Sequence, residues 1–388
     1  MLTLPETAGY PERTMNRPDL SACKGQKIAV GLSGGVDSSV SLLLLRDAGA
    51  VVNGITMKIY SGRLHHKLPD TLDACYGPNE AEDIDSCRDL CAREGIPYQA
   101  LDLATEYESQ ILDYFKAEYQ AGRTPNPCVR CNIEMKFGFL LQRARSAGIA
   151  FNRFATGHYA RLGQRAGITH LRTAVDTAKD QTYFLHRLNP STLDGVVFPL
   201  GGLTKPAVRE LAISYGLAAI AAKPESQDFV GGDYSLLFDD QQPGDIVDES
   251  GQVLGRHKGI VHYTIGQRRG IGMSLGPTPM YVLALDAAHN RVVVSANADL
   301  FAAGLEGSQA LVHDPALRSG EFRALVRIRQ NHRPAGAVLA LRDGQASIRF
   351  DDPQRAVAPG QSAVFYDDEG FVLGGCVIDR GIRLPAQA

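Results

Sequence analysis

The chain has 388 residues, of which 44% are hydrophobic and 21% charged, and its formal net charge is −3. That length and composition suit a soluble globular protein of two or three domains and exclude a wholly disordered chain. A membrane span of about 18 apolar residues is not expected, because the longest apolar run, residues 40–52, is broken by Arg46 and Asp47. With a slightly acidic balance, any surface for nucleic acid must be a local basic patch.

The N-terminal residues have neither the basic start nor the apolar stretch of a secretory signal. Seven cysteines in a long chain without such a signal indicate reduced thiols in the cytoplasm and not a disulfide framework. Residues 1–25 are expected to form a flexible tail.

The first half of the chain alternates short apolar runs with helical segments. A buried strand, a Ser/Gly turn, an apolar helix and a second strand follow one another, which is the start of a parallel sheet. The expected elements are strand 27–32, helix 40–48, strand 50–59, helix 81–94, strand 98–101, helix 106–121 and strand 153–156. Residues 26–222 are therefore predicted to form a doubly wound α/β domain.

Beyond residue 222 the sequence changes to turns, glycines and short alternating segments. Residues 223–300 are predicted to form a small, mostly β central domain. Over residues 301–388, short alternating segments recur between Pro, Gly and Asp residues, as in a small C-terminal β-barrel.

The segment SGGVDSS, residues 33–39, lies between the first strand and the helix that follows it. The free N–H groups of a helix N-terminus attract phosphate oxygens, and Gly34 and Gly35 let the backbone approach them. The segment lacks the Gly-Lys-Ser/Thr of a Walker loop and matches instead the SGGxDS signature of ATP-pyrophosphatase (PP-loop) enzymes, which leave AMP on a substrate oxygen. Asp37 is a candidate neighbour of Mg²⁺. An ordinary Gly-rich turn is the alternative.

Two thiols, Cys128 and Cys131, flank a pair of residues in a segment stiffened by two prolines. Arg123 and Arg130 lie nearby, and cations lower thiol pKa values, so the pattern favours exposed, reactive thiolates. A Cys-x-x-Cys pair suits a zinc half-site, a redox pair or a set of cluster ligands, and two packed thiols are the structural alternative.

The other cysteines carry weaker signals. Cys87 and Cys91 fall on one helical stripe with apolar residues, which favours the protein core. Cys75 lies in a turn-like segment and is ambiguous, whereas Cys23 and Cys376 carry little weight.

Further motifs follow along the chain, and with them it resembles the tRNA-specific 2-thiouridylases (MnmA family) from about residue 27 to 379. The motifs are TPNPCVRCNIEMKFG (124–138), ATGHYAR (155–161), KDQTYFL (179–185), FPLG, TK and VRE (198–210), KPESQDF (223–229), HYTIGQRRGIG (262–272) and FDDPQRAVAPGQSAVFY (350–366).

The resemblance implies a set of contacts, carried over residue by residue. ATP would contact Gly31, Leu32, Ser33, Gly34, Gly35, Val36, Asp37, Ser38, Met57 and Gly157. The target base would meet Asn126, Pro127 and Cys128, and other parts of the tRNA would contact Lys179, Asp180, Gln181, Arg327 and Ile328. Asp180 is also a candidate for positioning or proton transfer in catalysis. His158 either lines the nucleotide pocket or is a structural histidine.

The chain departs from the family pattern at two places. Cys131 matches the nucleophilic cysteine of the motif NPDxxCN, but Cys128 stands where the family has Asp. The second catalytic cysteine, expected in DSQxxCF, is missing from KPESQDF. In one scheme, Cys128 resolves a persulfide on Cys131. In the other, both join a third cysteine in holding a [4Fe–4S] cluster. Cys75 is the preferred third ligand, and Cys87 and Cys91 are the alternatives. We favour the cluster, because the resolving cysteine is gone.

The implied reaction begins with ATP and Mg²⁺, which convert the C2 oxygen of the tRNA wobble uridine into an AMP ester. Sulfur then replaces that oxygen to give 2-thiouridine, AMP and pyrophosphate. The partners would be the anticodon arm of tRNA and a sulfur donor such as a cysteine desulfurase or a sulfur-relay protein. The candidate RNA-binding cations are Arg256, His257, Lys258, Arg268 and Arg269 and, in the barrel, Arg327, Arg329 and Arg333.

Two alternatives belong to other functional classes. A paralogous PP-loop sulfurtransferase would act on another tRNA position or another acceptor. A non-catalytic protein would bind nucleotide and RNA without releasing pyrophosphate.

Overall fold

The computed structural model describes residues 17–63, 75–165, 167–223, 230, 234–239, 241–271 and 279–384. The KPESQDF motif falls outside the described residues except for Lys223, and so does the first part of the expected tail, residues 1–16. Within the described ranges, no helix is long and apolar enough to cross a membrane.

A five-stranded parallel sheet in the order β3-β2-β1-β4-β7 forms the centre of the first domain. Its strands are β1 (Lys27–Gly31), β2 (Val51–Lys58), β3 (Tyr98–Asp102), β4 (Arg153–Thr156) and β7 (Val196–Val197). The middle residues of β1 are fully buried, as expected for a parallel sheet covered on both faces. The strand order reverses beside β1, so the ends of β1 and β4 form the switch point at which such sheets bind ligands.

Helices cover both faces of this sheet, so the predicted doubly wound domain is confirmed. On one face lie α1 (Val36–Asp47), α2 (Glu80–Arg93) and α9 (Lys205–Ser214), whose apolar residues form one core with alternate residues of β1. The other core includes α3 (Ala104–Tyr107), η2 (Glu108–Leu112), α4 (Asp113–Gln120), η3 (Cys131–Phe139) and α6 (Leu140–Ser146). The short α5 (Pro127–Arg130) precedes η3. Smaller elements are β5 (Arg161–Arg165), β6 (Ile168–Arg172), α7 (Thr182–Leu185), α8 (Pro190–Leu193) and α10 (Ala218–Ala222).

Two of these segments, η2 and η3, are π-helical. The expected continuous helix 106–121 is therefore interrupted by the wider turns of η2. The second π-helical segment, η3, begins at Cys131 and connects α5 to α6. The N–H of Leu140 donates to the carbonyl of Met135, five residues earlier, at the end of η3. Long π-helical stretches are rare and occur often at functional sites.

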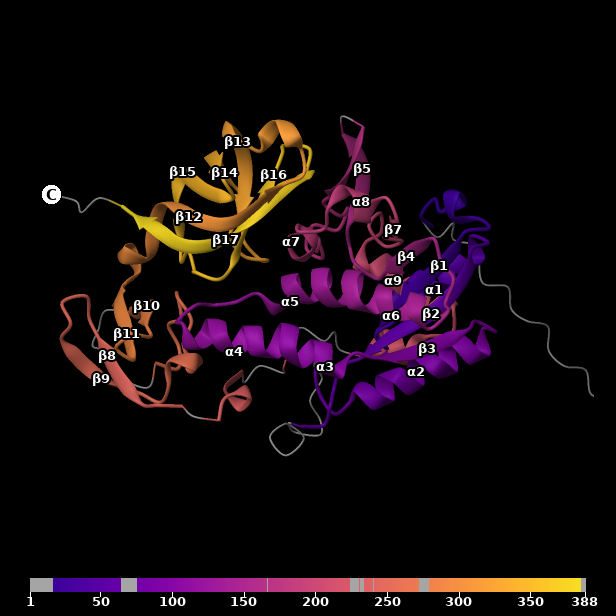
Figure 1. Ribbon diagram of the computed structural model, residues 1–388, viewed down its shortest axis with the longest axis horizontal. Coiled ribbons are helices and arrows are strands. Elements are labelled where there is room, and N and C mark those ends of the chain that lie inside the picture. Colours follow the sequence, from indigo (N-terminus) through magenta and orange to yellow (C-terminus); the bar gives the residue numbers. More distant parts are fainter. Residues whose placement is uncertain are drawn as a thin grey trace, which may run out of the picture.

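The central sheet and the barrel follow in the predicted order. The central sheet contains β8 (Gly244–Val247), β9 (Val253–His257), β10 (Met280–Asp286) and β11 (Arg291–Ala296). The closed barrel contains β12 (Phe301–Val312), β13 (Gly320–Arg327), β14 (Ala335–Arg342), β15 (Gln345–Arg355), β16 (Ser362–Tyr366) and β17 (Val372–Arg383). Short 3-10 turns are η1 (Ser21–Cys23), η4 (Tyr234–Leu237), η5 (Ile260–His262), η6 (Asn297–Leu300) and η7 (Pro315–Leu317). Figure 1 shows the barrel and central sheet at one end and the parallel sheet at the other, with α4 and α5 between them.

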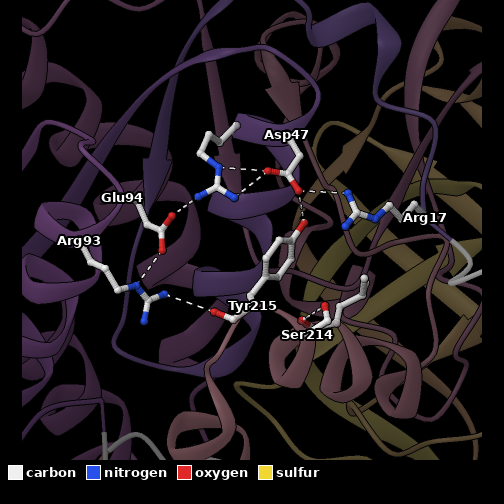
Figure 2. Close-up of polar contacts among 8 residues, drawn as sticks. Arg17, Asp47, Arg93, Glu94, Ser214 and Tyr215 are labelled. Carbon is white, nitrogen blue, oxygen red and sulfur yellow. Dashed lines mark hydrogen bonds and ion pairs between the residues drawn. The ribbon is translucent and has the colours of Figure 1, made fainter. Parts of the chain in front are cut away.

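Residues 17–25, which we expected to belong to a loose tail, are packed against the first domain. The Cys23 side chain is buried in the core beneath α1, because the turn η1 directs it inward. Arg17 Nη1 donates to Asp47 Oδ2 at 3.0 Å, and the Tyr215 hydroxyl donates to the same oxygen at 2.6 Å. Figure 2 shows Asp47 between these two side chains, with Arg93 and Glu94 alongside. The apolar Cys23 and this polar network hold the segment in place.

Candidate active site

The SGGVDSS segment connects β1 to α1 at the switch point. Gly35 caps α1 without a side-chain hydrogen bond, so free N–H groups of the first helical turn face the loop. Gly34 has φ +74°, and a Cβ there would lie 2.5 Å from Asp83 Oδ1 on α2, so the turn requires glycine. The N–H of Ser33 donates to Ser38 Oγ at 3.2 Å, which ties the two ends of the loop together. The geometry is that of an anion-binding loop.

Asp37, predicted as a neighbour of Mg²⁺, has other partners. Its two carboxylate oxygens each accept from Lys205 Nζ at 2.8 Å, and Oδ1 also accepts from the Tyr159 hydroxyl at 3.0 Å. Lys205 is buried at the start of α9. The ammonium neutralises the carboxylate, so the structure gives the magnesium prediction no support of its own.

The other predicted ATP contacts come together at the same edge of the sheet. Gly31 ends β1, Met57 lies near the end of β2, and Gly157 follows β4, and the carboxyl ends of parallel strands share one edge. A Cβ on Gly157 would lie 2.7 Å from the backbone nitrogen of Ser38, so the chain after β4 presses on the start of α1. The Asp37–Ser38 turn and Gly157 thus form one continuous backbone surface.

His158, the next residue, is buried beside this surface. Its Nδ1 lies 2.8 Å from Thr156 Oγ1, and its ring lies against those of Phe137 and Phe198, at 6.4 and 6.2 Å between centroids. Burial, and then the nearby Lys136 ammonium, lower the pKa of His158 well below its usual range. The imidazole is therefore neutral at pH 7.

The Cys-x-x-Cys segment is held in part by the C-terminal barrel. The N–H of Thr124 donates to the Pro359 carbonyl at 2.7 Å, and Gln361 Nε2 donates to the Thr124 and Pro125 carbonyls at 3.0 and 3.2 Å. A Cβ on Gly360 would lie 2.9 Å from the Thr124 backbone, so only glycine fits there. We name these three barrel residues, Pro359, Gly360 and Gln361, the clamp.

After the clamped residues, the chain turns into α5. Asn126 caps this helix by accepting from the Val129 N–H at 3.3 Å, with Pro127 in the first helical position. The Cys128 and Cys131 side chains are half-buried, and neither is in a disulfide. The three residues predicted to meet the target base, Asn126, Pro127 and Cys128, therefore lie on one helical turn beside Cys131.

Three cysteines influence the buried hydroxyl of Tyr107 electrostatically. Burial raises the pKa of Tyr107 well above its usual range, and Cys131, Cys75 and Cys128 each raise it further. Burial raises the pKa of Cys131 to about 11, with a smaller contribution from Cys75. Cys75, ambiguous in sequence, is thus a neighbour of the Cys-x-x-Cys pair. Among the described residues, however, no three His, Cys, Asp or Glu side chains stand in an arrangement that could hold a metal ion.

The two remaining candidates for a third ligand lie elsewhere. Cys87 and Cys91 are buried in the core on the α1 face of the sheet, whereas Cys131 packs against the core on the other face. Cys87 Sγ accepts from the N–H of Gly34 at 3.1 Å and so supports the phosphate loop. Burial raises the pKa of Cys91 to about 12. The prediction that these two cysteines belong to the core is confirmed.

Lys136 is a site residue that the sequence analysis did not single out. Its charge lowers the pKa of Cys131 and that of His158. In an α-helix, residues five apart point in different directions, but in the π-helical η3 they lie on one face, so Lys136 shares a face of η3 with Cys131. Lys136 forms no ion pair with a described residue. The only sequence signal was its place in the motif NIEMKFG.

Asp180 connects the first domain to the barrel. Its side chain is 2% exposed, and Oδ2 accepts from Arg327 Nη1 and from Thr182 Oγ1, both at 2.8 Å. Oδ1 accepts from the Ala174 N–H at 3.0 Å, and the backbone carbonyl of Asp180 accepts from Gln330 Nε2 at 2.6 Å. Every Asp180 oxygen is therefore engaged inside the protein.

The residues predicted to contact tRNA differ in their exposure to solvent and in their partners within the protein. Arg327 is paired with Asp180, and Ile328 is 2% exposed in the barrel core. Gln181 exchanges two hydrogen bonds of 2.9 Å with the backbone of Tyr159. Lys179 is partly exposed. Direct RNA contact by these residues stays a prediction. The structure shows Arg327 joined to Asp180, and the next residue, Gln181, joined to Tyr159, whose hydroxyl donates to Asp37.

Comparisons with known proteins agree with the order of the domains. Sequence models of protein families match residues 26–231 (tRNA methyl transferase HUP domain), 238–296 (tRNA methyl transferase PRC-barrel domain) and 305–378 (aminomethyltransferase beta-barrel domain). Among solved structures, the U34-tRNA thiolase NcsA from Methanococcus maripaludis, with its [4Fe-4S] cluster, matches with 18% identity and a TM-score of 0.33 over 55% of this chain and 63% of that chain. A TM-score this low carries no argument.

Similar sequences cover almost the whole chain. The tRNA-specific 2-thiouridylase MnmA of Endomicrobium trichonymphae is 41% identical over 358 residues, which are 91% of this chain and 99% of that protein. The protein of the same name from Acidithiobacillus ferrooxidans is 42% identical over 91% of this chain and 98% of its own length. The motifs, the PP-loop fold and these relatives agree: the chain belongs to the tRNA-specific 2-thiouridylase (MnmA) family of tRNA sulfurtransferases.

Proposed function

We propose that this enzyme uses ATP to adenylate the C2 oxygen of the wobble uridine of tRNA and then replaces that oxygen with sulfur. The observation that carries the proposal is the contact between η3 and the segment after β4. The ring of Phe137 in η3 lies 6.4 Å from that of His158, and the adjacent Gly157 presses on the N-terminus of α1. A thiol site and a phosphate-binding loop are thus neighbours, as a reaction that joins adenylation to sulfur transfer requires.

A uracil C2 oxygen is a poor leaving group, so it must first become part of an AMP ester. The α1 N-terminus and the Ser33 and Ser38 hydroxyls are placed to hold the ATP phosphates while the uridine oxygen attacks the α phosphorus and pyrophosphate leaves. Sulfur then attacks C2, and AMP leaves with the oxygen. Lys136, between the two sites, would stabilise the negative charge that develops in both steps. Mg²⁺ bound to the ATP phosphates stays a prediction.

The identity of the sulfur carrier rests on the three thiols around Tyr107. A free thiol at Cys131 is protonated at neutral pH, because burial raises its pKa to about 11. Coordination to a metal removes that proton, so a protonated thiol with two further cysteines that influence the same tyrosine suits a metal site better than a free nucleophile. Cys75, Cys128 and Cys131 would be the residues that hold a [4Fe–4S] cluster, and the cluster would supply sulfur at the oxidation level of sulfide. Since the three do not form a metal-binding arrangement among the described residues, Cys75 would have to move toward the pair.

The competing scheme uses no metal. Cys131 would carry a persulfide and Cys128, one helical turn away, would resolve it. That scheme leaves Cys75 without a role, and this is the difference that an experiment can measure. In either scheme a cytoplasmic sulfur donor, such as a cysteine desulfurase or a sulfur-relay protein, would supply the sulfur.

The test is an anaerobic assay with ATP, Mg²⁺ and unthiolated tRNA, read by mass spectrometry of the nucleosides and by AMP release. Sulfide is the sulfur source in one series, and a cysteine desulfurase with cysteine, which delivers sulfur already at the persulfide level, is the source in a parallel series. Wild type, Cys75→Ser, Cys128→Ser and Cys131→Ser are compared with Cys23→Ala, a buried cysteine remote in sequence from the site. The cluster scheme predicts that the three Ser variants lose both bound iron and 2-thiouridine, while Cys23→Ala keeps both.

Two other outcomes have definite meanings. Full thiolation by Cys75→Ser without iron would refute the cluster and leave the persulfide scheme. Binding of ATP and tRNA by the wild type, with no AMP and no thiolated nucleoside even after iron and sulfide are restored, would refute the proposed reaction and indicate a binding protein.

A further inference from the structure

The phosphate loop contains a carboxylate of its own. Asp37 lies in the first turn of α1, where free N–H groups and the helix dipole give partial positive charge. That charge attracts a carboxylate as well as a phosphate, so an aspartate at this place competes with the ATP phosphates and repels them. The Asp37 side chain is 31% exposed, so burial does not shield it from a ligand of the loop. A loop of this kind binds phosphate well only if the carboxylate is held elsewhere and neutralised.

Lys205 and Tyr159 bind the Asp37 carboxylate in place of the helix N-terminus. Both carboxylate oxygens accept from Lys205 Nζ at 2.8 Å, and Oδ1 also accepts from the Tyr159 hydroxyl at 3.0 Å. In the described part of the chain, no N–H group of α1 donates to this carboxylate. The N–H groups at the start of the helix therefore stay open to a phosphate.

The fold fixes Lys205 in the position from which it reaches Asp37. Its side chain is 6% exposed, and it is the first residue of α9, which Thr204 caps. The N–H of Lys205 donates to Asp176 Oδ2 at 2.9 Å, which anchors the start of this helix. The ammonium also lies 5.7 Å from the centroid of the Tyr159 ring, a distance at which a cation is attracted to the ring. Lys205 is thus preorganised, so little ordering is needed to hold the carboxylate.

Stability alone does not account for this ion pair. Burial of a lysine costs desolvation free energy that one ion pair offsets only in part, and apolar side chains often replace such pairs without loss of stability. The electrostatic effect is more specific, because Lys205 cancels the Asp37 charge where water screens charges poorly. Gly157 restricts the Asp37 side chain further, since a Cβ on Gly157 would lie 3.1 Å from the Asp37 Cβ. Without Lys205, the negative charge would stay beside the loop without a described cation to compensate it.

We infer that Lys205 is a positioning residue for ATP, which holds the Asp37 carboxylate away from the N–H groups of the phosphate loop and cancels the charge that would repel the phosphates. Lys205 acts through Asp37 and does not itself bind the nucleotide. The inference rests on the proposed function, which assigns the ATP phosphates to this loop. It predicts that the Asp37 charge is compensated, and not required, when ATP binds without a metal.

The experiment measures binding of ATP in EDTA by the full chain, by isothermal titration calorimetry without tRNA or a sulfur donor. Lys205→Met should raise the Kd about tenfold or more, because it leaves the Asp37 charge unpaired beside the phosphates. The double variant Lys205→Met/Asp37→Asn should restore the affinity, because the charge that Lys205 compensates is gone. Lys205→Arg should keep most of the affinity, because it keeps the positive charge. The control is Lys27→Met, which removes an exposed lysine at the opposite end of β1.

Two results would overturn the inference. One is a double variant that binds ATP as weakly as Lys205→Met, which would show that Lys205 contributes independently of Asp37. The other is an equal Kd for Lys205→Met and Lys27→Met. A purely structural role of Lys205 cannot produce the restored affinity, because the double variant lacks the ion pair as well, and thermal melting of each variant checks the fold. Because the readout is ATP binding without tRNA, absence of thiolation by the wild type would refute the proposed reaction and leave this inference standing.

Discussion

Lys136 is a half-buried lysine that forms no ion pair with a described acidic residue. Its ammonium favours negative charge at the Cys131 sulfur and opposes protonation of His158. We expect Lys136→Met to lower the single-turnover rate of thiolation about 100-fold, the effect typical of removing one preorganised electrostatic group. Lys136→Arg should keep part of the rate, and ATP affinity should be unchanged.

The matched control is Lys24→Met, which removes an exposed lysine from the N-terminal segment. Both variants should melt at the temperature of the wild type. Equal rates for the two variants would show that Lys136 plays no part in the reaction, while a parallel loss of rate and melting temperature would show a purely structural role.

At the scale of elements, the clamp joins a barrel turn to the Cys-x-x-Cys segment. Gln361→Leu removes three side-chain hydrogen bonds, one of them accepted from the Tyr183 hydroxyl at 3.4 Å, and leaves the Thr124 and Pro125 carbonyls without their donor. This should lower the free energy of unfolding by about 1–3 kcal/mol. The thiolation rate should fall more than ATP binding, because within the described part of the chain no hydrogen bond joins the phosphate loop to the clamp. Urea unfolding and ATP titration measure the two effects.

Gln345→Leu is the control for this prediction, since Gln345 is an exposed glutamine of the same barrel. If Gln361→Leu lost ATP affinity and thiolation in equal measure, the clamp would act on the whole protein and not on the thiol segment.

Sequence predicted the elements that depend on local patterns and missed those that depend on distant contacts. The strands β1 to β4 and the helix after SGGVDSS follow from apolar runs and turn residues, although α1 begins four residues earlier than expected, at Val36. The π-helical η3 was not predicted, because the apolar residues of CNIEMKFGF fit either helical period, and with it the position of Lys136 was missed. The clamp brings together residues 236 positions apart, which no local pattern reports.

At the scale of the whole molecule, Asp180 and Arg327 form a buried ion pair between the first domain and the barrel. Asp180→Ala leaves the Arg327 charge without its partner and should destabilise the protein by about 3–5 kcal/mol. The double variant Asp180→Ala/Arg327→Met should recover most of that loss. A double-mutant cycle from urea unfolding measures the coupling, and additive effects would contradict it.

Buried histidines make the same interface sensitive to acid. His313 Nε2 lies 3.0 Å from the carbonyl of His186, close to His170, and burial lowers the pKa of His186 to about 3 and that of His313 to about 4. Below about pH 6.5 these histidines bind protons in the unfolded chain but stay neutral in the folded chain. The free energy of unfolding is therefore highest above that pH and decreases as the pH falls toward 4. At pH 5 each histidine should cost about 2 kcal/mol relative to pH 7.5.

Urea unfolding at pH 7.5 and pH 5 measures this loss. His313→Asn should show a smaller difference between the two pH values than the wild type, although it is less stable at both. An unchanged difference would mean that other groups cause the acid sensitivity.

The clamp also fixes when the thiol site can be completed during protein synthesis. The ribosome makes Pro125 long before Gln361, which stands 236 residues later, and at about 5–20 residues per second the interval is roughly 12–50 s. The strands and helices of the phosphate loop are already synthesised in that interval, but the thiol segment has no anchor. A newborn chain can thus fold the edge of the sheet that carries the SGGVDSS loop before the Cys-x-x-Cys segment, and Cys128 and Cys131 are positioned only when the clamp residues have left the ribosome.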